Sequence, residues 1–193
     1  MKTTLSLCLC PAALALAGCG QGESNNAAPA QSDEAKEAAG DKTIAASLEQ
    51  NGRFLQAAKA VGLDATLAGP GPYTVLVPTD EAFAKVEGAL ADPADPKNRA
   101  EITRVLTYHI LPGVILAEDL SKAIENGDGK AVIATMGGET LTATKEGDAI
   151  VFTDSGGAKA KVAHADVKAT NGAIHHVDAV LTPSAKGAEQ PAG

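Results

Sequence analysis

The sequence predicts an α+β domain in which short helices come first and an antiparallel set of strands follows. In the first half of the chain, apolar residues recur every three or four positions, which is the spacing of a helix with one buried face. In the second half, short β-prone runs are separated by turns that contain glycine. Because the helices precede the strands instead of alternating with them, the order favours an α+β architecture over a parallel α/β sheet.

Two short helices open the domain. Ile44 and Leu48 lie four positions apart, and a second apolar stripe extends from Phe54 to Val61. Gly62 follows this stripe, at the place where a helix commonly ends in a left-handed residue. We therefore expect one helix around Ile44 and Leu48 and another that ends at Gly62.

Proline and threonine mark the first strand and the helix after it. Tyr73–Val77 is β-prone and lies between the Gly-Pro-Gly-Pro run at 69–72 and Pro78, which cannot donate to a ladder of backbone hydrogen bonds. Thr79 is a suitable N-cap for a helix, and the carboxylate of Asp80 in its first turn interacts favourably with the helix dipole. This segment is expected to be a strand that turns directly into a helix.

Further helices are predicted at about 96–108 and 117–124, and strands follow them. The predicted strands cover residues 130–136, 140–144, 149–153, 160–166 and 173–181. Turn pairs such as Asn171-Gly172 separate them and tolerate the positive φ angles of tight turns. The last run is the most apolar, so we expect it to be central in the sheet.

The N-terminus resembles a bacterial lipoprotein leader. Its apolar stretch is too short to span a bilayer comfortably, and the sequence Leu16-Ala17-Gly18 precedes Cys19 as in a lipobox. An ordinary secretory signal with a chance cysteine is the alternative, and both interpretations export the protein. The expected organisation is a signal peptide at 1–18, a lipidated Cys19 with a flexible linker at 19–41, a domain at 42–184 and a disordered tail at 185–193.

The charge of the chain excludes several partners. Its formal net charge is −8, and Lys2 would be lost with the leader. Phosphate-rich surfaces do not attract such a chain, so we expect no nucleic-acid partner and no electrostatic binding to anionic lipid. Membrane attachment is instead expected through acyl chains on Cys19, and Gly20 after it favours an outer-membrane destination if the host has two membranes.

Three segments in register resemble the fasciclin, or FAS1, family. Residues 73–83 resemble its first signature, residues 108–113 its central Tyr-His element, and residues 171–183 its second signature. The resemblance covers about 42–184 and implies helices packed on an antiparallel β-wedge or sandwich. It also implies a general role in adhesion or extracellular interaction.

The resemblance also offers candidate site residues. In the family, the Tyr-His element and an Asp-Ile pair ahead of the second signature are assigned to integrin binding, and they correspond here to Tyr108-His109 and to Asp166-Val167. Helical and strand spacing makes packing the favoured role for Tyr108-His109. A structural role is also expected for Thr79, Asp80, Asn171, Gly172 and His175. His176 departs from the large apolar residue that many relatives carry at this position.

No catalytic or metal site is predicted. Cys8 and Cys10 lie in the leader and Cys19 would be acylated, which leaves no thiol for a disulfide, a metal or nucleophilic catalysis. No serine lies in a Gly-x-Ser-x-Gly elbow, and the histidines lack His-Glu-x-x-His spacing. We therefore expect no enzyme activity, no metal and no cofactor.

The predicted function is adhesion, or binding of an extracellular protein or matrix polymer, by a lipid-anchored domain at the bacterial cell envelope. The alternative is a carrier of a small apolar ligand resembling a carotenoid or a lipid, as some secreted relatives are. The low aromatic content, 3% with no tryptophan, favours the first, because few rings are available to stack on a polyene or a sugar.

Overall fold

The computed structural model describes residues 40–49, 52–86, 92 and 95–184. The predicted leader, Cys19 and the tail at 185–193 lie outside the described residues, and so does most of the predicted linker. The helices are α2 (Ile44–Ser47), α3 (Arg53–Val61), α4 (Asp64–Ala68), α5 (Asp80–Ala84), the 3₁₀ helix η2 (Pro96–Asn98), α6 (Arg99–Tyr108) and α7 (Ala117–Asn126). The strands are β1 (Tyr73–Pro78), β2 (Ile110–Pro112), β3 (Lys130–Ala134), β4 (Thr140–Glu146), β5 (Ala149–Thr153), β6 (Lys159–Ala169) and β7 (Gly172–Val177).

The predicted α+β class is confirmed, but the sheet is mixed and not antiparallel throughout. Its seven strands follow the order β2-β1-β7-β6-β5-β4-β3. β7 pairs in parallel with β1 from Tyr73 opposite Gly172 to Pro78 opposite Val177, whereas its other neighbour, β6, is antiparallel. The expectation of an antiparallel sheet is therefore wrong at this pair, because the first strand of the chain joins the sheet beside the last one.

The last strand is interior, as predicted, but its length differs. β7 ends at Val177 and not at Leu181, since the chain leaves the ladder after Asp178 N donates to Lys161 O. β6 is longer than predicted and contains irregular register next to His164. Leu181 is nevertheless fully buried, so its place in the core comes from the segment after the strand and not from strand alternation.

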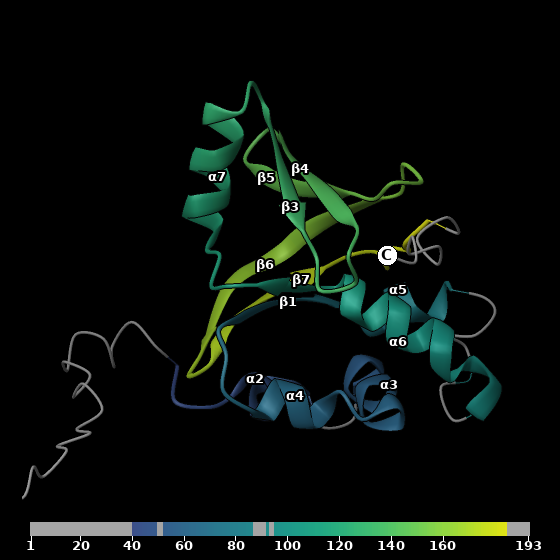
Figure 1. Ribbon diagram of the computed structural model, residues 1–193. Coiled ribbons are helices and arrows are strands. Elements are labelled where there is room, and N and C mark those ends of the chain that lie inside the picture. The colour runs from purple at the N-terminus through teal and green to yellow at the C-terminus, as the bar shows by residue number, and fades with distance from the viewer. Residues whose placement is uncertain (1–39, 50–51, 87–91, 93–94, 185–193) are drawn as a thin grey trace, which may run out of the picture. The chain divides into compact units, whose positions relative to one another are not determined.

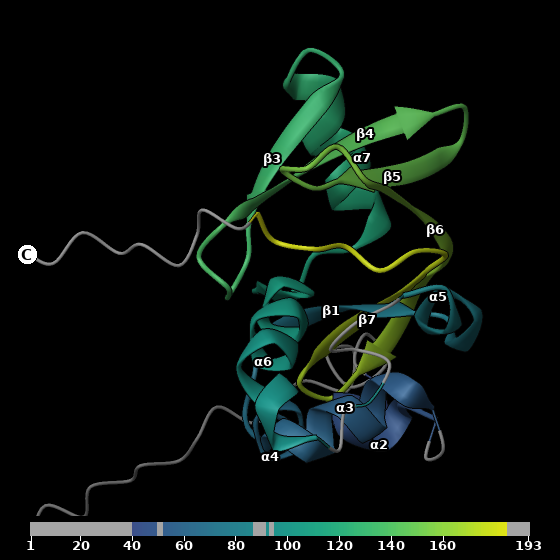
Figure 2. The ribbon, with the colours of Figure 1, turned by 90° about the vertical axis from the view of Figure 1, so that its right-hand side faces the viewer.

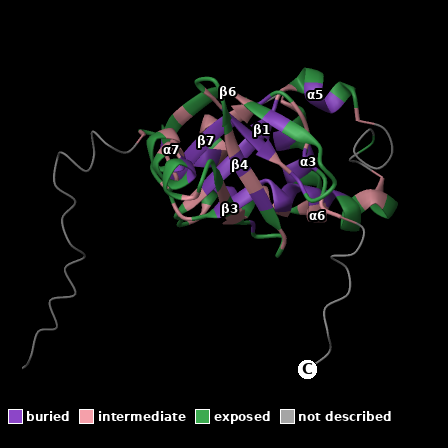
Figure 3. Ribbon diagram, turned by 90° about the horizontal axis from the view of Figure 1, so that it is seen from above, coloured by how far each residue is buried: buried purple, intermediate pink, exposed green. Residues whose placement is uncertain are grey.

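Two apolar layers lie on the two faces of the central strands. On one face lie α2, α3, α4 and α6 (Figure 1), and this layer contains side chains such as Val75 and Ile174. On the other face lie α7 and the strands from β4 to β6 (Figure 2), and this layer contains the side chains of Leu76, Phe152 and Val177. Figure 3 shows buried residues along β1 and β7, between the two layers.

The local signals in the sequence correspond to observed caps. Gly62 ends α3 with φ 82°, and the Thr79 hydroxyl accepts a hydrogen bond from Ala82 N at 3.3 Å at the start of α5. Asp80 acts beyond its own helix, because its Oδ1 accepts a hydrogen bond from Arg53 N at 2.9 Å at the start of α3. Helix α4, which the sequence pattern did not indicate, adds one short turn between α3 and β1.

The buried carboxylate of Asp154 and the partly buried carboxylate of Glu139 hold the end of the domain against the sheet. Asp154 Oδ2 accepts a hydrogen bond from Thr182 N at 3.1 Å, and Glu139 Oε2 accepts one from Ser184 N at 3.0 Å. Burial would raise the pKa of Glu139, but hydrogen bonds from Ser184 and Ser155 outweigh it and lower that pKa. The residues directly after Leu181 are therefore held to the sheet.

Candidate functional site

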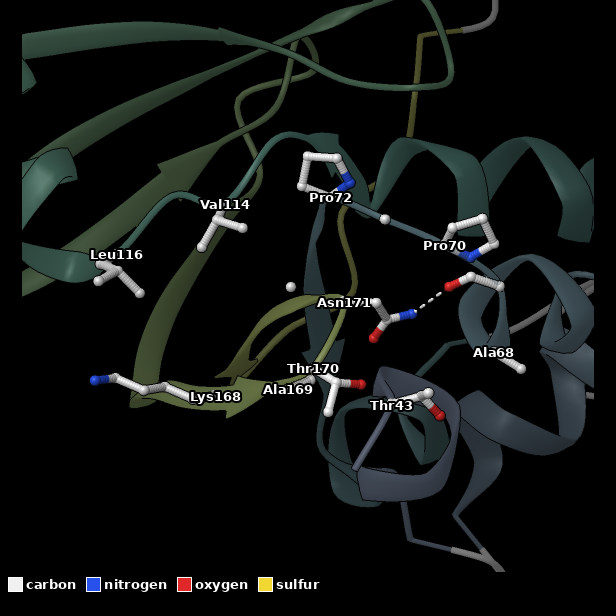
Figure 4. Close-up of a pocket in the computed structure, with 13 residues that line it drawn as sticks. Thr43, Ala68, Pro70, Pro72, Val114, Leu116, Lys168, Ala169, Thr170 and Asn171 are labelled. Carbon is white, nitrogen blue, oxygen red and sulfur yellow. Dashed lines mark hydrogen bonds between the residues drawn. The ribbon is translucent and has the colours of Figure 1, made fainter. Parts of the chain in front are cut away.

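A hollow of about 690 Å³ opens where three loop segments meet (Figure 4). The Gly69–Pro72 loop between α4 and β1 forms one wall, and Val114 and Leu116, between β2 and α7, form the opposite one. Residues 168–172, which cover the end of β6, the turn and the first residue of β7, form the floor together with Thr43. The volume lies in the range typical of small-molecule sites.

Asn171 joins the elements around this hollow. Its side-chain Nδ2 donates to Leu67 O at 2.9 Å and to Gly69 O at 2.8 Å, and its Oδ1 accepts a hydrogen bond from Ile44 N at 2.8 Å. The second signature therefore fixes α2 and α4 to the turn before β7. The structural role expected for Asn171 rests on these three bonds.

Gly172 allows two backbones to approach closely at the same place. A Cβ atom built on this residue would lie 1.8 Å from Tyr73 O, which is far inside contact distance. The residue also has φ 157°, a backbone conformation that L side chains rarely adopt, so the close approach and the dihedral angle both require glycine. The Asn-Gly pair thus serves two different needs.

Asp166 and His175 together position the wall formed by 114–116. His175 is fully buried; its Nδ1 accepts a hydrogen bond from Asp166 N at 3.2 Å, and this assigns the ring proton to Nε2, which donates to Ile115 O at 2.9 Å. Asp166 has φ 59°, and its Oδ1 accepts a hydrogen bond from Ala117 N at 2.8 Å at the start of α7. Both residues act on the backbone immediately after Val114.

Two segments that border the hollow carry exposed apolar side chains. Val114, on its rim, is 51% exposed, and Val167, next to Lys168 in sequence, is 36% exposed. Among the described residues, the other large apolar side chains that are exposed are Val132 and Met136, on β3 and in the turn after it. Of the predicted Asp-Val pair, Asp166 is thus engaged in a helix cap and Val167 is open to solvent.

Tyr108 and His109 do not reach the surface. Tyr108 is fully buried at the end of α6, its hydroxyl donates to Thr140 O at 3.1 Å, and burial raises its pKa. His109 is 1% exposed; its Nδ1 donates to Val105 O at 2.8 Å, and its Nε2 accepts a hydrogen bond from Leu181 N at 3.1 Å. Both side chains therefore lie inside the domain, as expected for the packing role that the sequence favoured, and neither offers an exposed side chain to a partner.

His164 and His176 face each other across β6 and β7. Burial, followed by the charge that His164 carries when protonated, lowers the pKa of His176. Within the described ranges, no group of three or more His, Cys, Asp or Glu residues is arranged to hold a metal ion. The absence of enzyme activity and of a metal stays a prediction.

The fasciclin-domain family model matches residues 49–183, a range that contains all three signature segments. The chain belongs to the fasciclin (FAS1) domain family. Its FAS1 domain is 36% identical over 142 residues to protein sll1483 of Synechocystis, which covers 72% of this chain and 71% of that protein. It is 32% identical to the transforming growth factor-beta-induced protein ig-h3 of Sus scrofa, covering 70% of this chain but only 18% of that much longer protein.

A solved structure shares the fold. It is the FAS1 domain pair from the insect cell adhesion molecule Fasciclin I, with a TM-score of 0.64, 21% sequence identity, and coverage of 77% of this chain and 53% of that one. The FAS1-type fold expected from the resemblance is thereby confirmed. No helix formed by the described residues of the FAS1 domain has the length and apolar character needed to cross a bilayer.

Proposed function

We propose that this chain is a tethered FAS1 interaction module that binds a protein or a matrix polymer at the bacterial cell envelope. Family membership and the likeness to an insect cell adhesion molecule support this role. The observation that carries the proposal is that Val167 and Val114 are exposed while Tyr108 and His109 are buried. Exposed apolar side chains mark interaction surfaces when they lie together in a patch, which is what the proposal requires of these two valines.

Side-chain hydrogen bonds hold the backbone near these two valines. Hydrogen bonds from Asp166 and His175 hold the backbone at Ile115 and Ala117, directly after Val114. Binding of a partner to this surface therefore costs the FAS1 domain little backbone entropy. The acidic charge of the chain favours a protein or polymer partner over a nucleic acid.

Replacing Val167 by Glu is expected to abolish partner binding without unfolding the domain. Because the side chain is 36% exposed, the charge stays solvated, and stability should change by no more than about 0.5 kcal/mol. Partners captured from envelope extract by the full chain would be quantified by mass spectrometry, and a loss of tenfold or more is expected. Val132→Glu, the same change at a more exposed valine on β3, is the control. Equal capture by wild type and both variants would contradict this surface.

The tether is proposed to be a lipid on Cys19, for which the Leu16-Ala17-Gly18 sequence is the support. We expect Cys19→Ser to release the protein from membrane pellets or to leave it unprocessed, since two acyl chains are needed for stable anchoring. Fractionation followed by mass spectrometry of the mature N-terminus measures both outcomes. Unchanged processing and unchanged membrane retention in the variant would rule out the lipid anchor. The domain would then be exported without one.

A second candidate function is transport or storage of a small apolar molecule. The hollow between the Gly69–Pro72 loop and Val114 favours it, because proline, glycine and aliphatic side chains form most of its lining. The two functions share Val114, but Val167, which is central to the first, does not line the hollow.

A further inference from the structure

The hollow beside the β6–β7 turn has a single charged side chain in its lining, that of Lys168. This cation lies in a chain whose formal net charge is −8, and its Nζ makes no ion pair with any residue that the structure describes. Figure 4 shows the Lys168 side chain extending toward one end of the hollow, below Leu116, while Pro70 and Ala68 lie at the other end. Charge is therefore concentrated at one end of the hollow.

Several other polar groups of the lining are already bonded. The Asn171 side chain makes three hydrogen bonds within the domain, and its carbonyl oxygen accepts one from Tyr73 N at 3.1 Å. Thr170 N donates to Lys42 O at 2.8 Å, and the Thr43 hydroxyl accepts a hydrogen bond from Ala46 N at 3.3 Å. A sugar or another richly polar ligand would find few partners here. An aromatic ligand would find no ring to stack on, since the lining contains none.

We propose that this hollow binds a single-chain anionic amphiphile, such as an alkyl carboxylate or an alkyl phosphate. The anionic head group pairs with the ammonium group of Lys168, and the alkyl chain lies along Val114, Leu116 and the Pro70–Pro72 wall. Removing the methylenes from water supplies the affinity, and the single cation selects the sign of the head group. This inference rests on the second candidate function and gives its ligand class.

The position of the hollow in the chain agrees with such a ligand. Gly40, where the described domain begins, packs against the backbone of Lys168. The segment that leads back to Cys19 therefore joins the domain beside the hollow. If the proposed anchor on Cys19 holds the domain at a membrane, that membrane is a source of alkyl anions and anionic lipids for the hollow.

Isothermal titration of the full chain carrying Cys19→Ser, which keeps its own acyl chains out of the assay, tests the proposal. Dodecanoate and dodecyl phosphate, kept below their micelle concentrations, are expected to bind at least tenfold more tightly than dodecyltrimethylammonium. Lys168→Met keeps the aliphatic stem and removes the charge, so it should weaken both anions at least tenfold and leave dodecanol unchanged. Lys161→Met, on the same strand but outside the lining, is the matched control.

Competition identifies the source of the anion. Displacement of bound dodecanoate by phosphatidylglycerol vesicles, but not by phosphatidylcholine vesicles, would assign a membrane lipid; displacement by neither would assign a free alkyl anion. Both results would support a single-chain anionic amphiphile as the ligand. The proposal is overturned if dodecanoate does not bind, or if Lys168→Met binds the anions as tightly as wild type. Neither result bears on partner binding at Val167, which lies outside the lining.

Discussion

Replacement of Tyr108 by Ala is expected to lower the free energy of unfolding by about 3–5 kcal/mol, the range for deleting a buried aromatic ring. The ring is fully buried at the end of α6, in the layer that also contains Leu111 and Leu141. Deleting it removes these contacts, leaves a cavity and deprives Thr140 O of its hydroxyl donor. Urea unfolding of the full chain, followed by circular dichroism, measures the change.

Tyr108→Phe separates the contribution of the ring to stability from that of the hydroxyl group. It keeps the ring and removes only the hydroxyl that donates to Thr140 O, so a loss of about 1 kcal/mol is expected. Partner binding per folded molecule should be unchanged in this variant, because the side chain does not reach the surface. A stability loss below about 1 kcal/mol for Tyr108→Ala would show that the ring is not packed as described.

Stability is also expected to fall as the pH drops from about 6.5 to about 4, through the buried imidazole of His109. Burial lowers its pKa in the folded domain to about 4, from 6.5 in the unfolded chain. Between these values the unfolded chain binds a proton that the folded domain does not, so the stability present above pH 6.5 is progressively lost. At about 1.4 kcal/mol per pH unit, the loss amounts to about 3 kcal/mol.

Two measurements isolate the contribution of His109. In NMR spectra of the full chain, its ring resonances should not titrate until the pH approaches 4. Removing the exposed His164 by His164→Gln should leave most of the pH slope of the unfolding free energy, whereas His109→Gln should remove much of it at the cost of lower stability. A His109 resonance that titrates near 6.5 would contradict the buried, doubly hydrogen-bonded ring.

The features of the fold that could be predicted are those that depend on residues close together in the sequence. The cap at Thr79 and the end of α3 at Gly62 follow from the backbone preferences of one or two residues, and both are observed. The burial of Tyr108 could also be inferred, because it lies three positions after Val105 on the apolar stripe of its helix. The integrin-contact alternative came only from the family resemblance.

The part that could not be predicted depends on pairing across long distances in the sequence. No periodicity indicates that β1 lies in parallel beside β7, because a strand pattern encodes which face is buried and not which strand is next to it. The hollow was missed for the same reason, since Val114, Lys168 and the Pro70–Pro72 loop come from three separate segments. The Gly-Pro-Gly-Pro run was a detectable signal, but it was interpreted only as the boundary of a strand.

The parallel pairing of β1 with β7 also has a consequence for the order of events during synthesis. Ile44 and Asn171, which bond to each other, are 127 positions apart, and β1 gains its central partner only when β7 is available. Such a topology folds slowly, because distant segments must meet before they stabilise each other. A nascent chain of this kind cannot close its sheet until nearly all of it has left the ribosome. For a protein proposed to be exported, this delay keeps the polypeptide unfolded, so that it can pass through a translocation channel, and postpones folding to the far side of the membrane.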